Sequence, residues 1–87
     1  NATARYGHTE ILITDETLQF GKNLMEMPLP DKTLVVMVKR GERFFVPTGL
    51  TELFNGDKLL VISDNEEALR ETYQNIGISN FSYQKNQ

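Results

Sequence analysis

The 87-residue sequence has no cysteine and no tryptophan, and it contains one histidine and three prolines. Without cysteine the chain can form no disulfide, and it offers no thiolate as a nucleophile or metal ligand. Its longest apolar run, residues 34–38, is far too short to span a bilayer. An excess of positive charge is also lacking, because nine Lys and Arg stand against twelve Asp and Glu. This balance argues against nucleic acid as the main partner and, more weakly, against an anionic membrane surface.

The composition that remains is that of a folded domain, with 39% hydrophobic and 24% charged residues. A chain of this length buries only about 60–65% of its unfolded surface, which leaves little room for a deep cleft. A small domain without disulfides relies on its core or on oligomerisation, so a binding site between two copies is favoured over one inside a single chain. We expect residues 1–2 to be an expression-tag remnant, residues 3–77 to form the domain and residues 78–87 to form a polar tail.

Four stretches have the composition of strands. The strongest is 32–39, where the apolar run 34–38 is continuous and therefore predicts that both faces of the strand are covered. A tight turn at Arg40-Gly41-Glu42 leads into a returning strand at 43–47, and further strands are expected at 8–14 and 58–62.

Two helices are expected between these strands. Phe20, Leu24 and Met27 are spaced for one face of a short helix within 18–27, which Pro28 would end. A second helix is expected from about residue 65 to residue 76, with Ser63 or Asp64 as its cap. The order β-α-β-β-β-α predicts an α+β domain, a two-layer sandwich of a mixed or antiparallel sheet with two helices on one face.

The sequence contains no Gly-x-Ser-x-Gly elbow and no glycine-rich phosphate loop. Asp57 and Glu52 could do acid–base work in a water-poor site, but an aspartate after glycine more often accepts turn hydrogen bonds, and we favour that role. We therefore expect no enzyme, no metal and no cofactor.

Two features near the predicted hairpin concern binding. Lys39, Arg40 and Arg43 could hold an anionic ligand or a partner's carboxylates, although a solvated hairpin tip would explain them as well. Phe44 and Phe45 point to opposite faces of the sheet, so one ring requires a cover other than the core. An exposed ring on so small a sheet indicates an interface.

Three sequence blocks resemble the C-terminal domain of TrkA, also called the RCK C-terminal domain. The first is residues 21–30, Gly-Lys-Asn-Leu-Met-Glu-Met-Pro-Leu-Pro, which is similar to the opening signature of that family. The second combines Lys-Arg-Gly-Glu at 39–42 with Val-Pro-Thr-Gly at 46–49, and the third is Leu-Phe-Asn-Gly-Asp-Lys-Leu-Leu-Val at 53–61. The blocks occur in the family's order and spacing, and the resemblance covers residues 8–73.

The resemblance implies a regulatory domain of a bacterial potassium or sodium/proton transport protein, located at the cytoplasmic face of the inner membrane. It also implies a homodimer, a membrane-embedded transporter part as partner, and a nucleotide or cyclic dinucleotide as a possible ligand between the two copies. The ligand residues that it implies are Met27, Pro28, Leu34, Val35 and Arg43, and the interface that we expect lies around Leu24, Met27, Val35 and Val46.

This chain departs from ligand-binding members of the family at two of these positions. Polar groups are expected where it has Pro28 and Leu34, which leaves Arg43 alone to contact a phosphate. The alternative function is therefore a dimerisation module without a ligand.

Overall fold

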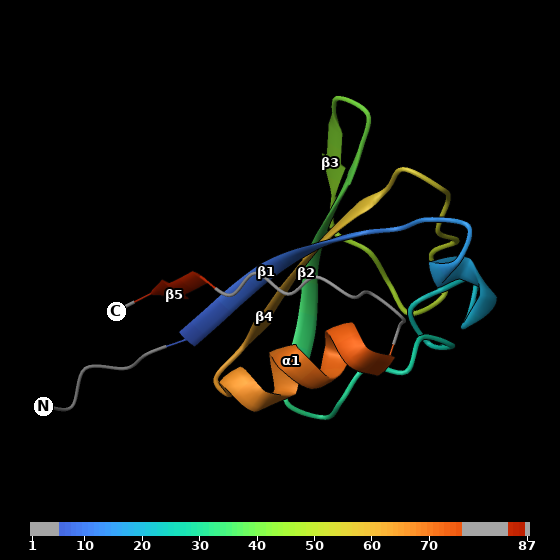
Figure 1. Ribbon diagram of the computed structural model, residues 1–87. Helices are drawn as coiled ribbons and strands as arrows, with labels where there is room; N and C mark the ends of the chain where they lie inside the picture. The colour runs from blue at the N-terminus through green and yellow to red at the C-terminus, as the bar shows by residue number, and fades with distance from the viewer. Residues whose placement is uncertain (1–5, 76–83, 87) are drawn as a thin grey trace, which may run out of the picture.

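The structure is a computed structural model that describes residues 6–75 and 84–86 (Figure 1). The elements follow the chain as β1 (Tyr6–Leu12), the 3₁₀ turn η1 (Thr17–Gln19), β2 (Thr33–Arg40), β3 (Arg43–Phe45), β4 (Lys58–Ser63), α1 (Glu66–Asn75) and β5 (Gln84–Asn86). The predicted expression-tag remnant at residues 1–2 lies outside the described residues.

The strands form one sheet in the order β3-β2-β4-β1-β5, and each described pair is antiparallel. The predicted hairpin is present, since β2 returns as β3 through a turn in which Gly41 has a φ of 61°. This left-handed conformation is open to glycine at little steric cost. Residues 84–86, within the predicted polar tail, pair with the start of β1.

The short helix predicted for residues 18–27 is replaced by η1 and a series of turns. Side chains there bond to the backbone and compete with helix formation. The carboxamide oxygen of Asn23 accepts a hydrogen bond from the Glu26 N–H at 3.0 Å, and the Glu26 carboxylate accepts one from the Lys22 N–H at 2.8 Å. Of the two predicted helices, the described residues contain one α-helix, α1.

Helix α1 lies close to its predicted bounds, but its cap is neither Ser63 nor Asp64. The Asn65 side chain accepts the N–H groups of Glu67 at 2.9 Å and Ala68 at 3.4 Å. Ser63 is still the last residue of β4, and its hydroxyl donates to the carbonyl of Lys32 at 2.6 Å. The serine therefore ties the start of α1 to the start of β2, and the asparagine two residues later is the cap.

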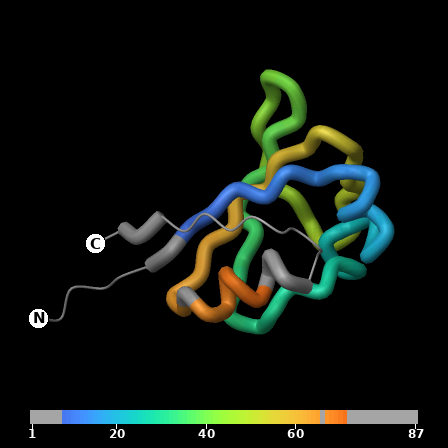
Figure 2. The backbone as a smooth tube through the Cα atoms, viewed as in Figure 1, coloured from blue at the N-terminus to red at the C-terminus, as the bar shows by residue number. Residues whose placement is uncertain are grey.

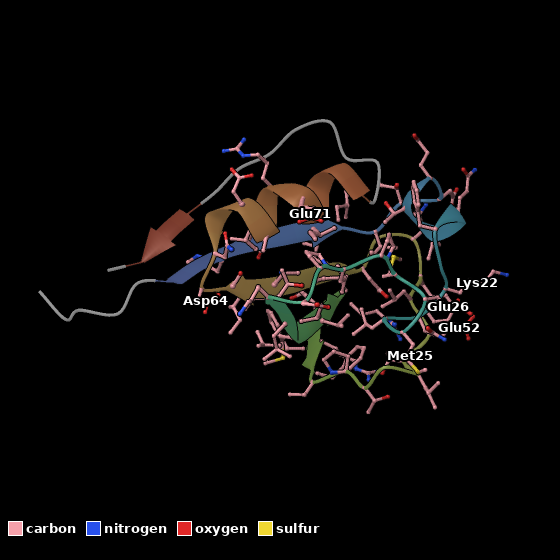
Figure 3. The ribbon with its side chains drawn as sticks, turned by 90° about the horizontal axis from the view of Figure 1, so that it is seen from below. Lys22, Met25, Glu26, Glu52, Asp64 and Glu71 are labelled. Atoms are coloured by element: carbon pink, nitrogen blue, oxygen red, sulfur yellow. The ribbon has the colours of Figure 1, made fainter. Side chains whose placement is uncertain are left out.

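Burial alternates along β4, where Leu59, Val61 and Ser63 are buried and the residues between them are half-buried. The buried face packs against α1 and the segment 13–29, and the core consists of Ile11, Ile13, Met27, Val38, Leu53, Leu59, Val61 and Leu69. In Figures 1 and 3 the helix lies on one side of the sheet, and no described helix covers the other side. No described helix is long and apolar enough to cross a membrane.

The two adjacent phenylalanines of β3 behave as their alternation predicts. Phe45 pairs with Val38 and packs against the core, whereas Phe44 pairs with Lys39 on the outer face and is 65% exposed. The prediction that one ring would belong to the core and the other would point to the opposite face of the sheet is therefore confirmed.

Candidate functional site

Among the described residues, a buried ion pair joins Arg40 at the end of β2 to Asp57 just before β4. The Asp57 carboxylate accepts hydrogen bonds from Nε of Arg40 at 2.9 Å, from Nη2 of Arg40 at 2.8 Å and from the N–H of Phe54 at 2.9 Å. The Asp57 side chain is 2% exposed and that of Arg40 is 34% exposed. The turn hydrogen bond expected of an aspartate after glycine is thus present, together with a two-pronged ion pair.

Two opposing effects set the pKa of Asp57. Burial alone raises it, but the hydrogen bonds from Arg40 and Phe54 and the attraction of the guanidinium outweigh burial and hold the pKa below its ordinary value. The hydrogen bond to Asp57 in turn raises the pKa of Arg40. Asp57 is therefore ionised at neutral pH with its carboxylate fully engaged, which makes it unsuitable as an acid–base catalyst.

Aromatic rings enclose the guanidinium of Arg40. Its central carbon lies 5.0 Å from the ring centre of Phe45 and 4.7 Å from that of Phe54, within the range of cation–π attraction. Nη2 also donates to the carbonyl of Glu52 at 2.9 Å. Arg40 thereby fastens the β2–β3 hairpin to the loop 46–57, and it is not available to hold a ligand.

A second set of contacts joins the segment 21–27 to the same loop (Figure 2). The Leu53 N–H donates to the carbonyl of Lys22 at 2.8 Å, and the Met25 N–H donates to that of Gly49 at 3.0 Å. Figure 3 shows Lys22, Met25 and Glu52 close together at one end of the molecule. Gly21 is required there, because a Cβ at this position would lie 2.6 Å from Cβ of Glu26.

The five predicted ligand residues do not converge within one chain. Met27 is 6% exposed and belongs to the core, and Val35 packs against it. Leu34 lies at the start of β2, whereas Arg43 pairs with Arg40 at the other end of that strand, roughly 20 Å away at about 3.3 Å per residue. A ligand that touches both ends must therefore be long or bridge two copies.

Two shallow depressions flank the start of β2. One, of about 610 Å³, lies between Pro28 and α1, and its charged residues are Asp31, Lys32, Glu67 and Glu71. The other, of about 380 Å³, contains Leu34 and Ile62, and its charged residues are Asp31, Lys32 and Asp64. Carboxylates outnumber Lys32 in both, so neither depression of a single chain suits a phosphate. No group of three acidic or histidine side chains in the described part of the chain could hold a metal ion.

Comparison with known proteins decides the family. The family model of the TrkA-C domain matches residues 8–77, which include all three motif blocks. The chain belongs to the TrkA-C domain family. A solved structure described as an RCK domain with cda is 26% identical to it, covering 79% of this chain and 96% of the other at a TM-score of 0.64.

A second solved structure has the same fold at 21% identity and a TM-score of 0.65, covering 78% of this chain and 80% of the other. It is described as the RCK C domain of the potassium transport protein KtrA in complex with cyclic diadenosine monophosphate. The motif blocks by which the TrkA-C domain was identified form the contacts described above: the turn at 21–26, the arginine of the hairpin and the aspartate before β4.

The residues expected at a dimer interface are mostly turned inward in this TrkA-C domain. Leu24 and Val35 are partly buried against the core and Met27 belongs to it, whereas Val46 is 72% exposed.

Apolar side chains also line the outer face of the sheet, which we call the outer strip: Leu34, Met37, Phe44, Leu60 and Ile62. Leu34 and Phe44 are exposed, and the other three are half-buried. Apart from Leu34, expected at a ligand site between two copies, and Phe44, expected to need a cover other than the core, these residues were not assigned to a surface from the sequence. Burial alternates along β4, but the sequence does not reveal this alternation because residues 59–62 are all hydrophobic.

Proposed function

We propose that this TrkA-C domain is a regulatory domain of a bacterial potassium or sodium/proton transport protein, at the cytoplasmic face of the membrane. The family match over residues 8–77 carries the proposal. The fold similarity to an RCK C domain of a potassium transport protein supports it. A catalytic role has no comparable support, since the best candidate carboxylate, Asp57, is engaged in three hydrogen bonds.

The proposal includes a homodimer with a small ligand between the copies, and cyclic diadenosine monophosphate is the candidate that the KtrA structure suggests. Pro28 and Leu34 lie far from Arg43 within one chain. A two-fold axis can bring one end of a strand against the opposite end of its partner, so that Arg43 of one copy approaches Leu34 of the other.

Binding can be tested by thermal unfolding of the chain with cyclic diadenosine monophosphate, with linear diadenosine monophosphate and AMP as controls. A ligand at a hundredfold excess over its Kd stabilises the folded state by about 2.7 kcal/mol, which raises the Tm by roughly 10–20 °C in a domain of this size. We expect the shift to vanish in Arg43→Ala and to persist in Lys39→Ala, which removes a neighbouring cation. A Tm that is unchanged by all three nucleotides would contradict the proposal that the domain binds cyclic diadenosine monophosphate.

A dimerisation module without a ligand is the second candidate function. The observation that favours it is the excess of carboxylates in both depressions beside Pro28 and Leu34. Under this function the chain is dimeric in solution, and its Tm does not respond to nucleotides. The gene that encodes the domain provides a further check, because membrane-spanning segments or a Gly-rich βαβ unit on the same chain are expected for a transport protein.

A further inference from the structure

The turn that ends the loop 46–57 contains the one Asn-Gly pair of the sequence, Asn55-Gly56. The turn is closed by a hydrogen bond from the Asp57 N–H to the Phe54 carbonyl at 3.0 Å. Gly56 has a φ of 96°, a left-handed conformation that glycine adopts at little steric cost. Asparagine is also common in turns, because its side chain can bond to the nearby backbone. The shape of the turn therefore favours this pair, in which no side chain shields the nitrogen that follows the asparagine.

The two residues of the pair are restrained very differently. Both are exposed, and the Asn55 carboxamide forms no hydrogen bond within the described part of the chain. A Cβ at Gly56 would meet no heavy atom within 4 Å outside the adjoining residues, so no group packs over the turn there. The Gly56 N–H, by contrast, donates to the carbonyl of Ile13 at 2.7 Å, and Ile13 is 0% exposed. The Ile13 N–H donates in return to the Asp57 carbonyl at 2.7 Å, which continues the pairing of β1 with β4.

We propose that Asn55 is a site of spontaneous deamidation, and that the hydrogen bond between Gly56 and Ile13 sets its rate. In this reaction the Gly56 amide nitrogen loses its proton to hydroxide and forms a bond to Cγ of Asn55. The side-chain nitrogen takes up a proton and leaves as ammonia, which produces a cyclic succinimide. Water then opens the ring: cleavage of the bond between Cγ and nitrogen gives aspartate, and cleavage of the main-chain bond gives isoaspartate. The net change replaces ammonia with water, without oxidation or reduction.

The hydrogen bond opposes the first step, because the N–H that Ile13 holds is the one that must be released and deprotonated. Release requires the turn to separate from β1, at the end of the β1–β4 ladder. Local openings of this kind have free energies between about zero and the global stability. The folded domain therefore reacts at the rate of the unprotected sequence multiplied by the fraction of molecules in which this contact is open. Hydrogen exchange of the Gly56 amide requires the same release and deprotonation, so folding should slow both processes by the same factor.

Deamidation changes the loop at a contact that the fold uses. Both products add a negative charge two residues before Asp57. Isoaspartate also inserts an additional carbon into the main chain between Phe54 and Gly56. The Asp57 carboxylate accepts hydrogen bonds from the Phe54 N–H at 2.9 Å and from Nη2 of Arg40 at 2.8 Å, and the first depends on the spacing within the turn. Isoaspartate formation therefore loosens the contact that fastens the hairpin to the loop.

Deamidation and hydrogen exchange can be compared at the same amide. The full chain would be incubated at pH 7.5 and 37 °C, both folded and in guanidinium chloride, and mass spectrometry would follow aspartate and isoaspartate at position 55. In the denatured chain we expect Asn55 to react much faster than Asn23, the internal reference, because the Leu24 side chain hinders attack there. In the folded chain we expect Asn55 to react at least about tenfold more slowly. This factor should match the protection of the Gly56 amide, measured by NMR hydrogen exchange, within about threefold.

Two variants show whether the controlling opening is local. Arg40→Gln weakens the loop beside the turn, so deamidation at Asn55 and exchange at Gly56 should accelerate together and by the same factor. Asn65→Ala is the matched control, because it removes the helix cap beyond the other end of β4 and should leave both rates within about twofold of the wild type. Circular dichroism shows that each variant is folded at the incubation temperature, and Asn55→Gln checks the assignment of the modified peptide.

Three results would overturn the inference. If Asn55 reacts no faster than Asn23 in the denatured chain, the pair is not a labile site. If Asn55 reacts equally fast in the folded and the denatured chain while the Gly56 amide is protected, the hydrogen bond to Ile13 does not set the rate. If Asn65→Ala accelerates deamidation as much as Arg40→Gln does, global unfolding controls the reaction in place of local opening. None of these results depends on ligand binding or cation flux, which test the regulatory function separately.

Discussion

Replacing Asp57 with asparagine removes the charge of the buried ion pair while nearly preserving its shape. Asparagine keeps one acceptor oxygen but turns an amide NH₂ toward the donors of Arg40, which lie 2.8 and 2.9 Å from the carboxylate. Removing one partner of a fully buried pair costs about 3–5 kcal/mol. Because the Arg40 side chain is 34% exposed, solvent recovers part of this loss, and we expect a destabilisation of about 2–3 kcal/mol.

Urea unfolding at pH 7, followed by circular dichroism, measures this loss. The matched control is Glu42→Gln, which removes a charge from the exposed hairpin turn and should change the stability by less than about 0.5 kcal/mol. Under thermal unfolding the Asp57→Asn variant should melt roughly 10–20 °C below the wild type. A variant within about 0.5 kcal/mol of the wild type would refute the assignment of the Arg40–Asp57 pair as a major stabilising contact.

The same pair predicts how stability depends on pH. The pKa of Asp57 in the folded state is below its ordinary value of 3.8, so the unfolded chain takes up the proton first as the pH falls. The stabilisation is fully present above that ordinary value and is lost as the pH drops through the folded-state pKa. Acid titration of the wild type should show this loss, and Asp57→Asn should lack it. An equal acid response in both proteins would contradict the pKa assignment.

Further predictions concern backbone positions, each measured by the free energy of unfolding. Gly21→Ala should cost about 2 kcal/mol or more, because its Cβ would lie 2.6–2.8 Å from Cβ and backbone atoms of Glu26. In Gly49→Ala the new Cβ meets only the Met25 side chain, which can move, so the substitution should cost less than about 1 kcal/mol. A larger loss of stability in Gly49→Ala than in Gly21→Ala would contradict the packing at 21–26. Asn65→Ala should cost about 1 kcal/mol through loss of the helix cap, and an unchanged stability would argue against that cap.

The strands could be predicted from sequence because their signals are local. The apolar run 34–38, the hairpin glycine at 41 and the hydrophobic stretch before Ser63 each restrict a few neighbouring residues to one conformation. The resemblance to the TrkA-C domain family was a further guide, because three motif blocks follow one another in the family's order. The family match over residues 8–77 confirms this resemblance.

The segment 18–27 could not be assigned correctly by spacing alone. Phe20, Leu24 and Met27 have helical spacing, but Asn23 and Glu26 bond to nearby N–H groups and hold turns instead. Periodicity does not reveal which side chains will compete with the backbone in this way.

Contacts between residues that lie far apart in the sequence also could not be predicted from local sequence patterns. Arg40 and Asp57 are seventeen residues apart, and only the folded loop brings them within hydrogen-bond distance. Similarly, the sequence identifies Leu34 and Ile62 as hydrophobic, but which face of the sheet they occupy depends on the register of β2 against β4.

Cation flux tests the regulatory role most directly. The transport protein that carries this domain would be expressed in cells that lack their own potassium uptake, and potassium and sodium fluxes would be measured with and without residues 8–77. The Glu42→Gln variant serves as the control for a harmless change in the same domain. We expect deletion of the domain to change how flux responds to added cyclic diadenosine monophosphate or to external cation, with the transporter present at an equal level. Fluxes that are identical in the intact and the deleted protein under all these conditions would contradict a regulatory function.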